Sequence, residues 1–244
     1  MKIYFAGTES KKTTALLKGL GVKYFLTSFF HINKWHFDKQ DDVILDSGGF
    51  SARIRGVPIN VYDYVKFINE NKVKLAINLD TNDVKETLNN HEILEKETDA
   101  YVMPVYHLSD FKDKEHRSLI DGFILKYPYI CVGGMAGGRN KKTEIINFLD
   151  YVFSKTKDKI KVHGLGLTGK YFMNKYPLYS VDSTSWLQFA RYGSTYAIKD
   201  KKLKLFSKKQ LKCYEKYNVE AKYWIGEQRY YDKLWLKRGV TWNE

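Results

Sequence analysis

Short apolar segments rich in β-branched and aromatic residues recur along the chain and alternate with helical patterns. Such alternation predicts βαβ units and a parallel sheet. The expected strands are residues 2–6, 22–27, 42–46, 73–79, 101–106, 128–132, 160–163 and 178–182. The clearest helical patterns are residues 60–71, 82–98, 111–126, 141–156 and 184–192, and Asn82 is the expected N-cap of the second.

Eight strands between residues 2 and 182 fit an α/β fold with a compact (β/α)8 TIM-like barrel, near the lower size limit of that architecture. A doubly wound open sheet is the competing architecture. The first connections are weakly helical, so the early barrel is expected to be irregular. We expect residues 1–200 to form the barrel. Residues 201–244 should form a helical appendage packed on it, with a strand at 202–206 and helices near 208–218 and 221–238.

The charge of the chain is uneven and favours a polyanionic partner. The 244 residues carry a formal charge of +13, of which residues 201–244 contribute +7 from 12 Lys/Arg and 5 Asp/Glu. The same segment holds nine aromatic residues, and cations interleaved with flat rings suit a nucleic acid strand. The expected phosphate contacts are Arg139, Lys141, Lys208, Lys209 and Lys212. The alternative is an amphipathic helix whose rings face the core, within a lysine-rich composition.

Several classes of protein are excluded or disfavoured by the residues that the chain lacks. No apolar run reaches the roughly 20 residues of a membrane span, and the N-terminal apolar run is too short for a signal peptide. The two cysteines are far apart, so a disulfide framework or a cysteine-based zinc site is disfavoured. Neither HExxH nor GxSxG occurs. We expect a cytoplasmic protein without a catalytic metal.

Three aspartates stand where expected strands end. Asp46 closes the third strand, Asp80 follows the fourth, and Asp182 closes the eighth. Catalytic groups of barrels gather at the carboxyl ends of the strands. Paired carboxylates are the usual equipment for glycosidic chemistry, one as nucleophile and one as proton carrier. Each aspartate alone is also a good turn or N-cap residue, but three at the ends of different strands favour a site.

Glycine pairs and histidines accompany these strand ends. Gly48-Gly49 and Gly133-Gly134 permit close approach of the backbone to a ligand. The second pair could also belong to a weak phosphate-binding turn ahead of Arg139, or to a packing turn. His163 and His107 are each more typical of structural hydrogen bonding than of catalysis.

The motifs around these residues resemble those of tRNA-guanine transglycosylases. Asp46–Phe50 reads DSGGF and resembles their DSGG[FY] signature, and Val132–Gly137 reads VGGMAG and resembles their GG[LM]A turn. Val181–Trp186, which reads VDSTSW, is similar to their strand-eight aspartate motif. It is closest to the DNA-directed branch, the deazapurine DNA transglycosylases of bacterial and phage DNA-modification systems. The matching motifs span roughly residues 40–190.

The resemblance implies a (β/α)8 barrel and a role for each matched residue. Asp182 would be the nucleophile at C1′ of the target nucleotide, and Asp46 the general acid and base. Asp80 would accept hydrogen bonds from the purine edge, while Tyr106 replaces a glutamine of the tRNA enzymes. The base-binding set that it implies is Ser47, Gly48, Phe50, Asp80, Tyr106, Gly133, Gly134, Met135, His163 and Leu165.

One departure from the tRNA enzymes bears on the substrate. Those enzymes carry a CxCxxC…H zinc site after the barrel, and this chain has only Cys213 in that region. We therefore expect DNA in preference to tRNA, with a free 7-deazaguanine such as 7-cyano-7-deazaguanine as the second substrate. The resemblance further implies that no cofactor is needed and that a phage-encoded enzyme would act in the host cytoplasm. A partner protein could supply access to the DNA. The alternatives are tRNA-directed exchange, a hydrolytic N-glycosidase, and a non-catalytic nucleic-acid-binding barrel.

Overall fold

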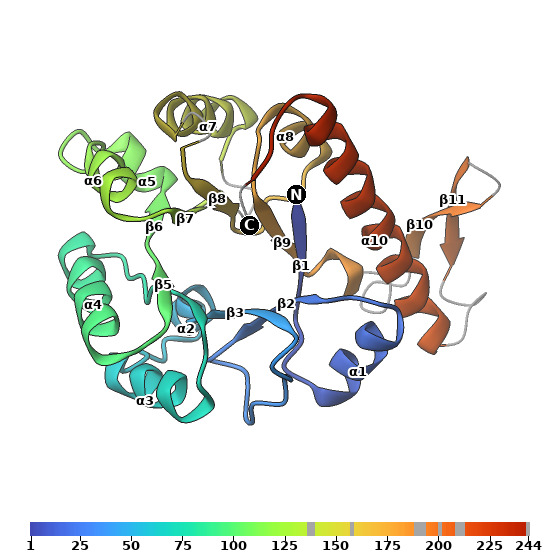
Figure 1. Cartoon of the computed structure of the whole chain (residues 1–244), viewed down its shortest axis with the longest axis horizontal. Coiled ribbons are helices and arrows are strands. Elements are labelled where there is room, and N and C mark those ends of the chain that lie inside the picture. Colours follow the sequence, from blue (N-terminus) through green and yellow to red (C-terminus); the bar gives the residue numbers. More distant parts are fainter. Residues whose placement is uncertain (136–139, 157–158, 188–193, 200–201, 208–212, 243–244) are drawn as a thin grey trace.

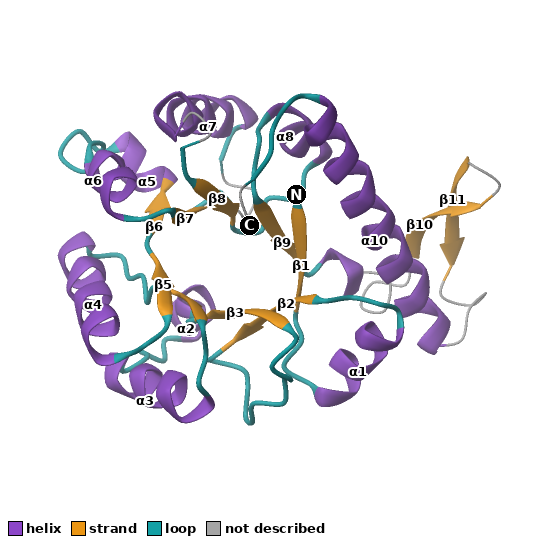
Figure 2. Ribbon diagram, viewed as in Figure 1, coloured by secondary structure: helices purple, strands orange, loops and turns teal. Residues whose placement is uncertain are grey.

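Nine parallel strands form one sheet that curves into a TIM-like barrel in this computed structural model (Figures 1 and 2). The structure describes residues 1–135, 140–156, 159–187, 194–199, 202–207 and 213–242. The strand order is β5-β4-β3-β2-β1-β9-β8-β7-β6, and helices surround the sheet. The expected α/β barrel is thus confirmed, and the open doubly wound sheet is not what the chain forms.

The strands follow the expected apolar segments closely. They are β1 Lys2–Ala6, β2 Tyr24–Ser28, β3 Asp42–Asp46, β4 Leu75–Ile77, β5 Tyr101–Met103, β6 Val105–His107, β7 Tyr129–Gly133, β8 Lys161–Gly164 and β9 Ser180–Ser183. The helices up to residue 187 are α1 Lys11–Gly19, α2 Gly49–Arg55, α3 Val61–Asn71, α4 Val84–Glu97, α5 Leu108–Lys112, α6 Leu119–Lys126, α7 Lys142–Thr156, α8 Lys170–Lys175 and the 3-10 helix η1 Ser185–Leu187.

Some helices differ from the expectation. The structure adds α1, α2 and α8, whose short or weakly patterned segments gave no clear helical signal. The N-cap of α4 is Asp83 and not Asn82, because the Asp83 carboxylate accepts the backbone N–H of Glu86 at 3.0 Å. Of the helix expected at 184–192, η1 is described, and residues 188–193 lie outside the described residues.

The barrel closes at a proline. The expected fifth strand is divided at Pro104, which has no backbone N–H to give to a ladder. β5 pairs with β4 and β6 pairs with β7, so the two ends of the sheet are consecutive in the chain. Cys131 N of β7 donates to Pro104 O at 2.8 Å, so the proline carbonyl between β5 and β6 is also hydrogen-bonded within the sheet.

Alternate residues of the strands face the inside and the outside of the barrel, as the pleat of a strand requires. One cluster of buried side chains lies inside and includes Tyr4, Ile44, Met103, Val105 and Cys131. A larger cluster lies between the sheet and the helices and includes Phe5, Phe25, Tyr106, Val132 and Val181. Asp46 follows Ile44 by two positions and therefore shares its inward side of β3.

The chain ends in β10 Ser194–Lys199, β11 Lys202–Ser207 and α10 Cys213–Lys237. The first two form an antiparallel hairpin, which lies beside α10 at the edge of the molecule (Figure 1). One helix thus stands where the sequence predicts two, and the expected strand at 202–206 has an unexpected partner. The expected boundary at residue 200 lies outside the described residues.

Helix α10 packs on the barrel beside β1 (Figure 1). Trp224, Tyr231 and Trp235 are buried in the cluster between sheet and helices. The amino group of Met1 donates to Asp232 Oδ1 at 2.5 Å. These three rings therefore belong to the hydrophobic core, which agrees with the alternative that residues 201–244 include an amphipathic helix whose rings face the core. Among the helices described, none combines the length and the apolar character that a membrane crossing requires.

Candidate active site

The three aspartates lie at one end of the barrel, where the parallel strands finish. Asp46 is the last residue of β3, Asp182 is the last but one of β9, and Asp80 lies three residues after β4. Each carboxylate is close enough to influence the others, because the charges of Asp80 and Asp182 both act on Asp46. The structure therefore brings the expected constellation together.

Asp46 is the carboxyl that these surroundings favour in its neutral form. Burial, together with the negative charges of Asp80 and Asp182, raises the pKa of Asp46 to about 7. The backbone N–H of Gly48 donates to Asp46 Oδ2 at 3.1 Å and opposes this rise only in part. A carboxyl with this pKa can both give and take a proton near neutral pH.

Asp80 has partners that favour its charged form. His107 Nε2 lies 3.1 Å from Asp80 Oδ2, and Arg53 Nη1 lies 3.4 Å from the same oxygen. Arg53 also donates to the backbone O of Asp80 at 2.9 Å. Burial opposes ionisation, but His107 and Arg53 outweigh it and hold the pKa of Asp80 below its ordinary value. Asp46 and Asp80 thus have opposite protonation tendencies within one site.

Asp182 is held by one of its two oxygens. The backbone N–H of Gly166 donates to Asp182 Oδ1 at 2.7 Å, and His163 Nε2 lies 3.3 Å from the same atom. His163 is fully buried, whereas 13% of the Asp182 side chain remains exposed. Asp182 Oδ2 accepts no hydrogen bond from the residues that the structure describes.

Glycines leave room for these groups. Gly48 has φ +80°, and a Cβ there would lie 2.5 Å from Phe30 Cβ. A Cβ on Gly49 would lie 2.8 Å from the backbone O of Asp80. Gly133 and Gly134 lie against the His107 ring, where added Cβ atoms would come within 3.3 Å and 3.2 Å of it. The two glycine pairs therefore let Asp80 and His107 lie close to the turns that follow β3 and β7.

The other residues expected around the base fall into different places. Phe50 is 59% exposed at the start of α2. Leu165 is half-buried and packs over Gly133, at 3.2 Å from its would-be Cβ. Ser47 is buried, and its Oγ accepts the Gly49 N–H at 3.4 Å. Met135 is buried in the cluster between sheet and helices.

Tyr106 does not lie with the three aspartates. Its ring is fully buried between the sheet and the helices, against Phe148, and its hydroxyl donates to Arg117 O at 2.9 Å. Successive residues of a strand face opposite sides. His107, the next residue, therefore points to the site in place of Tyr106. The motif alignment favoured the wrong neighbour, and the alternation of the strand was the signal that selects His107.

Arg53 and Gly166 are two further groups that the sequence analysis did not assign to the site. Arg53 lies on α2, a helix without a clear sequence signal, and reaches Asp80 across the turn. Gly166 contributes only a backbone N–H, which residue identity does not reveal.

The expected nucleic acid contacts are only partly described. Lys141 is exposed just before α7. Arg139, Lys208, Lys209 and Lys212 lie outside the described residues.

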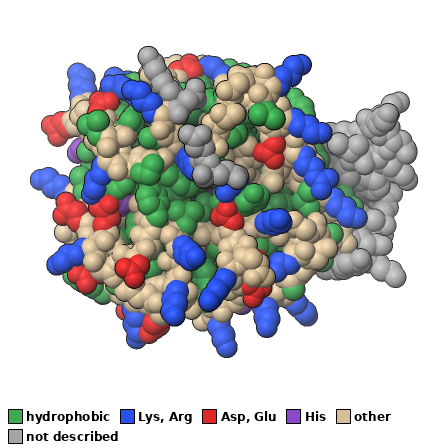
Figure 3. Space-filling model, in the orientation of Figure 1, with side chains coloured by type: hydrophobic (Ala, Val, Ile, Leu, Met, Phe, Trp, Pro, Cys, Tyr) green, Lys and Arg blue, Asp and Glu red, His purple; other side chains and the backbone are tan. Residues whose placement is uncertain are grey.

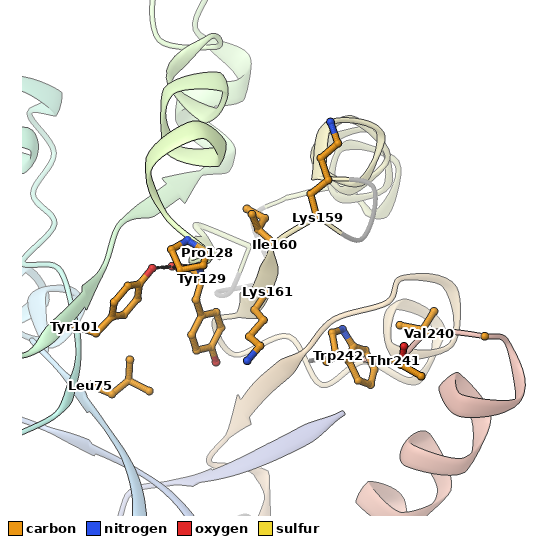
Figure 4. Close-up of a pocket in the computed structure, with 11 residues that line it drawn as sticks. Leu75, Tyr101, Pro128, Tyr129, Lys159, Ile160, Lys161, Val240, Thr241 and Trp242 are labelled. Carbon is orange, nitrogen blue, oxygen red and sulfur yellow. Dashed lines mark hydrogen bonds between the residues drawn. The ribbon is translucent and has the colours of Figure 1, made fainter. Parts of the chain in front are cut away.

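Two cavities differ in their relation to the aspartates. One of about 440 Å³ lies beside α2 and is lined by Gly49, Arg53 and Asp80 among others. A larger one of about 580 Å³ lies at the opposite end of the barrel, because Leu75, Tyr101, Tyr129 and Lys161 on its wall begin their strands (Figure 4). In the face that Figure 3 shows, hydrophobic side chains gather towards the centre, with lysine and arginine around them.

The described residues contain no group of three or more His, Cys, Asp or Glu side chains arranged to hold a metal ion. Comparison of the chain with protein-family models and with curated proteins found no match. The class that fold and site define is therefore a TIM-like α/β barrel with a carboxylate cluster at the carboxyl end of its strands.

Proposed function

We propose that this protein is a nucleic acid base-exchange transglycosylase that replaces guanine, preferably in DNA, by a 7-deazaguanine. The observation that carries the proposal is that two unlike carboxyl groups share one site. Asp46 has a pKa of about 7, and Asp182 is hydrogen-bonded through only one of its two oxygens. Glycosyl transfer through a covalent intermediate needs one proton carrier and one nucleophile. The motif resemblance supports the same two assignments.

The proposed reaction has two balanced steps. Asp182 attacks C1′ of the target nucleotide, the bond to guanine breaks with its electron pair on the base, and protonated Asp46 gives the base a proton. A glycosyl ester on Asp182 and an ionised Asp46 result. The incoming deazaguanine then attacks C1′ through its ring nitrogen, Asp46 takes the proton from that nitrogen, and Asp182 is released as carboxylate. Asp46 needs a pKa near neutral pH for this cycle.

Asp80 is the proposed acceptor for the N–H edge of the purine. A carboxylate that recognises two N–H groups of guanine must stay ionised, and His107 and Arg53 favour that form. A guanine edge placed here would bring its N–H donors to an anion that is already oriented. This role makes Asp80 a specificity residue and leaves proton transfer to Asp46.

Helix α2 offers the surface for the polymer beside the site. Large exposed hydrophobic residues are uncommon in the described part of the chain, and four of the eight fall between residues 50 and 62. Phe50 and Ile54 are 59% and 70% exposed and, four positions apart, share one face of α2. The Arg55 guanidinium lies 5.5 Å from the centroid of the Phe30 ring. Rings, an apolar side chain and cations together suit an unstacked strand with its phosphates.

The test is release of labelled guanine from DNA by purified protein supplied with 7-cyano-7-deazaguanine. We expect wild-type protein to release guanine and incorporate the deazaguanine, and Asp182→Asn to lose both. Asp63→Asn, which changes an exposed carboxylate on α3, is the matched control and should remain active. No release by wild-type protein from DNA or tRNA would refute the proposal.

The same assay separates the alternatives. Release that needs no deazaguanine and leaves abasic sites would identify a hydrolytic N-glycosidase. Exchange on tRNA alone would move the activity to the tRNA-directed class. Binding of DNA without release would support a non-catalytic barrel.

The α2 surface has a separate test. Ile54→Ala should weaken binding of single-stranded DNA about fivefold, the equivalent of about 1 kcal/mol of lost contact. Leu125→Ala removes an equally large side chain that is 89% exposed on α6, and it should leave binding unchanged. Equal effects of the two substitutions would remove α2 from the proposed interface.

A further inference from the structure

A chain of buried polar side chains crosses the interior of the barrel from the candidate nucleophile towards its opposite end. His163 Nε2 faces Asp182 Oδ1 at 3.3 Å, and His163 Nδ1 lies 2.6 Å from Ser180 Oγ. Ser180 Oγ lies 2.5 Å from the Tyr129 hydroxyl. His163 and Ser180 are fully buried, and Tyr129 is 8% exposed. Groups so buried must satisfy their hydrogen bonds with one another.

The direction of the proton donors follows from the two ends of this chain. A carboxylate oxygen only accepts, so a proton on the ring nitrogen that faces Asp182 is favoured over a lone pair there. His163 Nε2 makes no hydrogen bond among the described residues, and its contact with Asp182 Oδ1 at 3.3 Å is an ion-pair contact. The neutral ring then has a bare Nδ1, which accepts from the Ser180 hydroxyl, and Ser180 in turn accepts from Tyr129.

The opposite direction leaves a proton unsatisfied. If Nδ1 donated to Ser180 and Ser180 to Tyr129, the Tyr129 O–H would have no acceptor among the described residues. Burial raises the pKa of Tyr129 well above its ordinary value, so this hydroxyl keeps its proton and remains a donor. Tyr129 lines the cavity at the far end of the barrel, where Figure 4 shows it between Tyr101 and Lys161.

We propose that Ser180 and Tyr129 are positioning residues, which hold His163 in its Nε2–H form and thereby commit Oδ2 of Asp182 to attack. The Gly166 N–H donates to Oδ1, His163 Nε2 lies 3.3 Å from the same atom, and Oδ2 accepts no hydrogen bond from the described residues. A carboxylate fixed through one oxygen presents the other in a defined direction. The assignment of Oδ2 as the attacking atom rests on the proposed function, whereas the tautomer of His163 does not.

The tautomer can be measured directly by NMR of the full-length protein labelled with ¹⁵N-histidine. The His163 signals, assigned by their loss in His163→Gln, should show a proton on Nε2 and none on Nδ1 in wild-type protein. Tyr129→Phe removes the donor to Ser180 and leaves Ser180 free to accept from Nδ1, so it should raise the share of the Nδ1–H form. Val162→Ala is the matched control, because it shortens the neighbouring buried side chain that faces the helices, and it should keep the Nε2–H form.

Kinetics distinguish a positioning role from a loss of packing. Ser180→Ala should lower kcat for guanine exchange about 10- to 100-fold, because misplacing a reacting group can cost on the order of 100-fold. The KM of Ser180→Ala should change little, and so should the kcat of the control Val162→Ala. An Nδ1–H ring in wild-type protein, or an unchanged tautomer in Tyr129→Phe, would overturn the inference. If the tautomers are as expected but the protein exchanges no base, the positioning of His163 by Ser180 and Tyr129 is upheld and the proposed function is rejected.

Discussion

Substitution of Asp46 by asparagine should make the protein more stable at neutral and alkaline pH while abolishing exchange. The pKa of Asp46 is about 7 in the folded protein and 3.8 without the fold. At about 1.4 kcal/mol for each pKa unit, holding this carboxylate ionised in the folded state costs about 4 kcal/mol. Asparagine has the shape of the neutral acid and keeps an oxygen for the Gly48 N–H, so it avoids this cost.

The sign and the pH window follow from linkage. A group whose pKa is raised on folding stabilises the folded state below its unfolded pKa, and this stability is lost as the pH rises through the folded value. Wild-type protein should therefore lose stability relative to Asp46→Asn between about pH 4 and about pH 7. Above about pH 7 the difference in the free energy of unfolding should stay constant. Between about pH 5 and about pH 8 the difference should grow by about 2.5 kcal/mol.

The assay is urea unfolding of wild-type and Asp46→Asn proteins at a series of pH values. Subtraction of the two curves cancels every other titrating group that the substitution leaves unaltered. Asp63→Asn, at an exposed position, should run parallel to wild-type protein. If Asp46→Asn also runs parallel, or loses more stability at high pH, burial and neighbouring charge do not raise this pKa. The role of Asp46 as general acid would then be untenable.

Two further substitutions test how the site and the barrel are built. Gly48→Ala should cost about 3 kcal/mol or more, since φ is +80° and the new Cβ would lie 2.5 Å from Phe30 Cβ. Gly56→Ala, with φ +66° and open space around the new Cβ, should cost only about 1 kcal/mol; equal losses in urea unfolding would refute the close-approach argument. Tyr101→Phe removes a hydroxyl that donates to Tyr129 O at 2.8 Å and accepts from Tyr129 N at 3.1 Å. It should cost about 1–3 kcal/mol, and an unchanged melting temperature would show that closure of the barrel does not depend on this bridge.

The sequence by itself determined the class of fold and the places where chemistry could occur. β-branched and aromatic segments alternating with helical ones are local signals, and they located each strand of the barrel. The aspartates were visible because they follow such segments directly. Since parallel strands end at one edge, their position in the chain already implied a shared site.

Weak local signals explain what was missed in the fold. Helix α2 is short and has a glycine at each end, so no periodic pattern in the sequence revealed it. The contact of Arg53 with Asp80 was missed for the same reason. The tail looked like a strand-binding surface because its rings and lysines alternate. Only the packing of α10 against β1 shows that Trp224, Tyr231 and Trp235 belong to the core.

The tertiary structure alone decided how the aspartates differ. Asp46 acquires a pKa of about 7 from burial and from the charges of two residues that are 34 and 136 positions away. Asp80 is ionised because His107 and Arg53 reach it from other elements. Likewise, His163, Ser180 and Tyr129 form one chain only because the barrel folds β7, β8 and β9 side by side. Burial and Coulomb interactions depend on distance through space, whereas the patterns in a sequence record only distance along the chain.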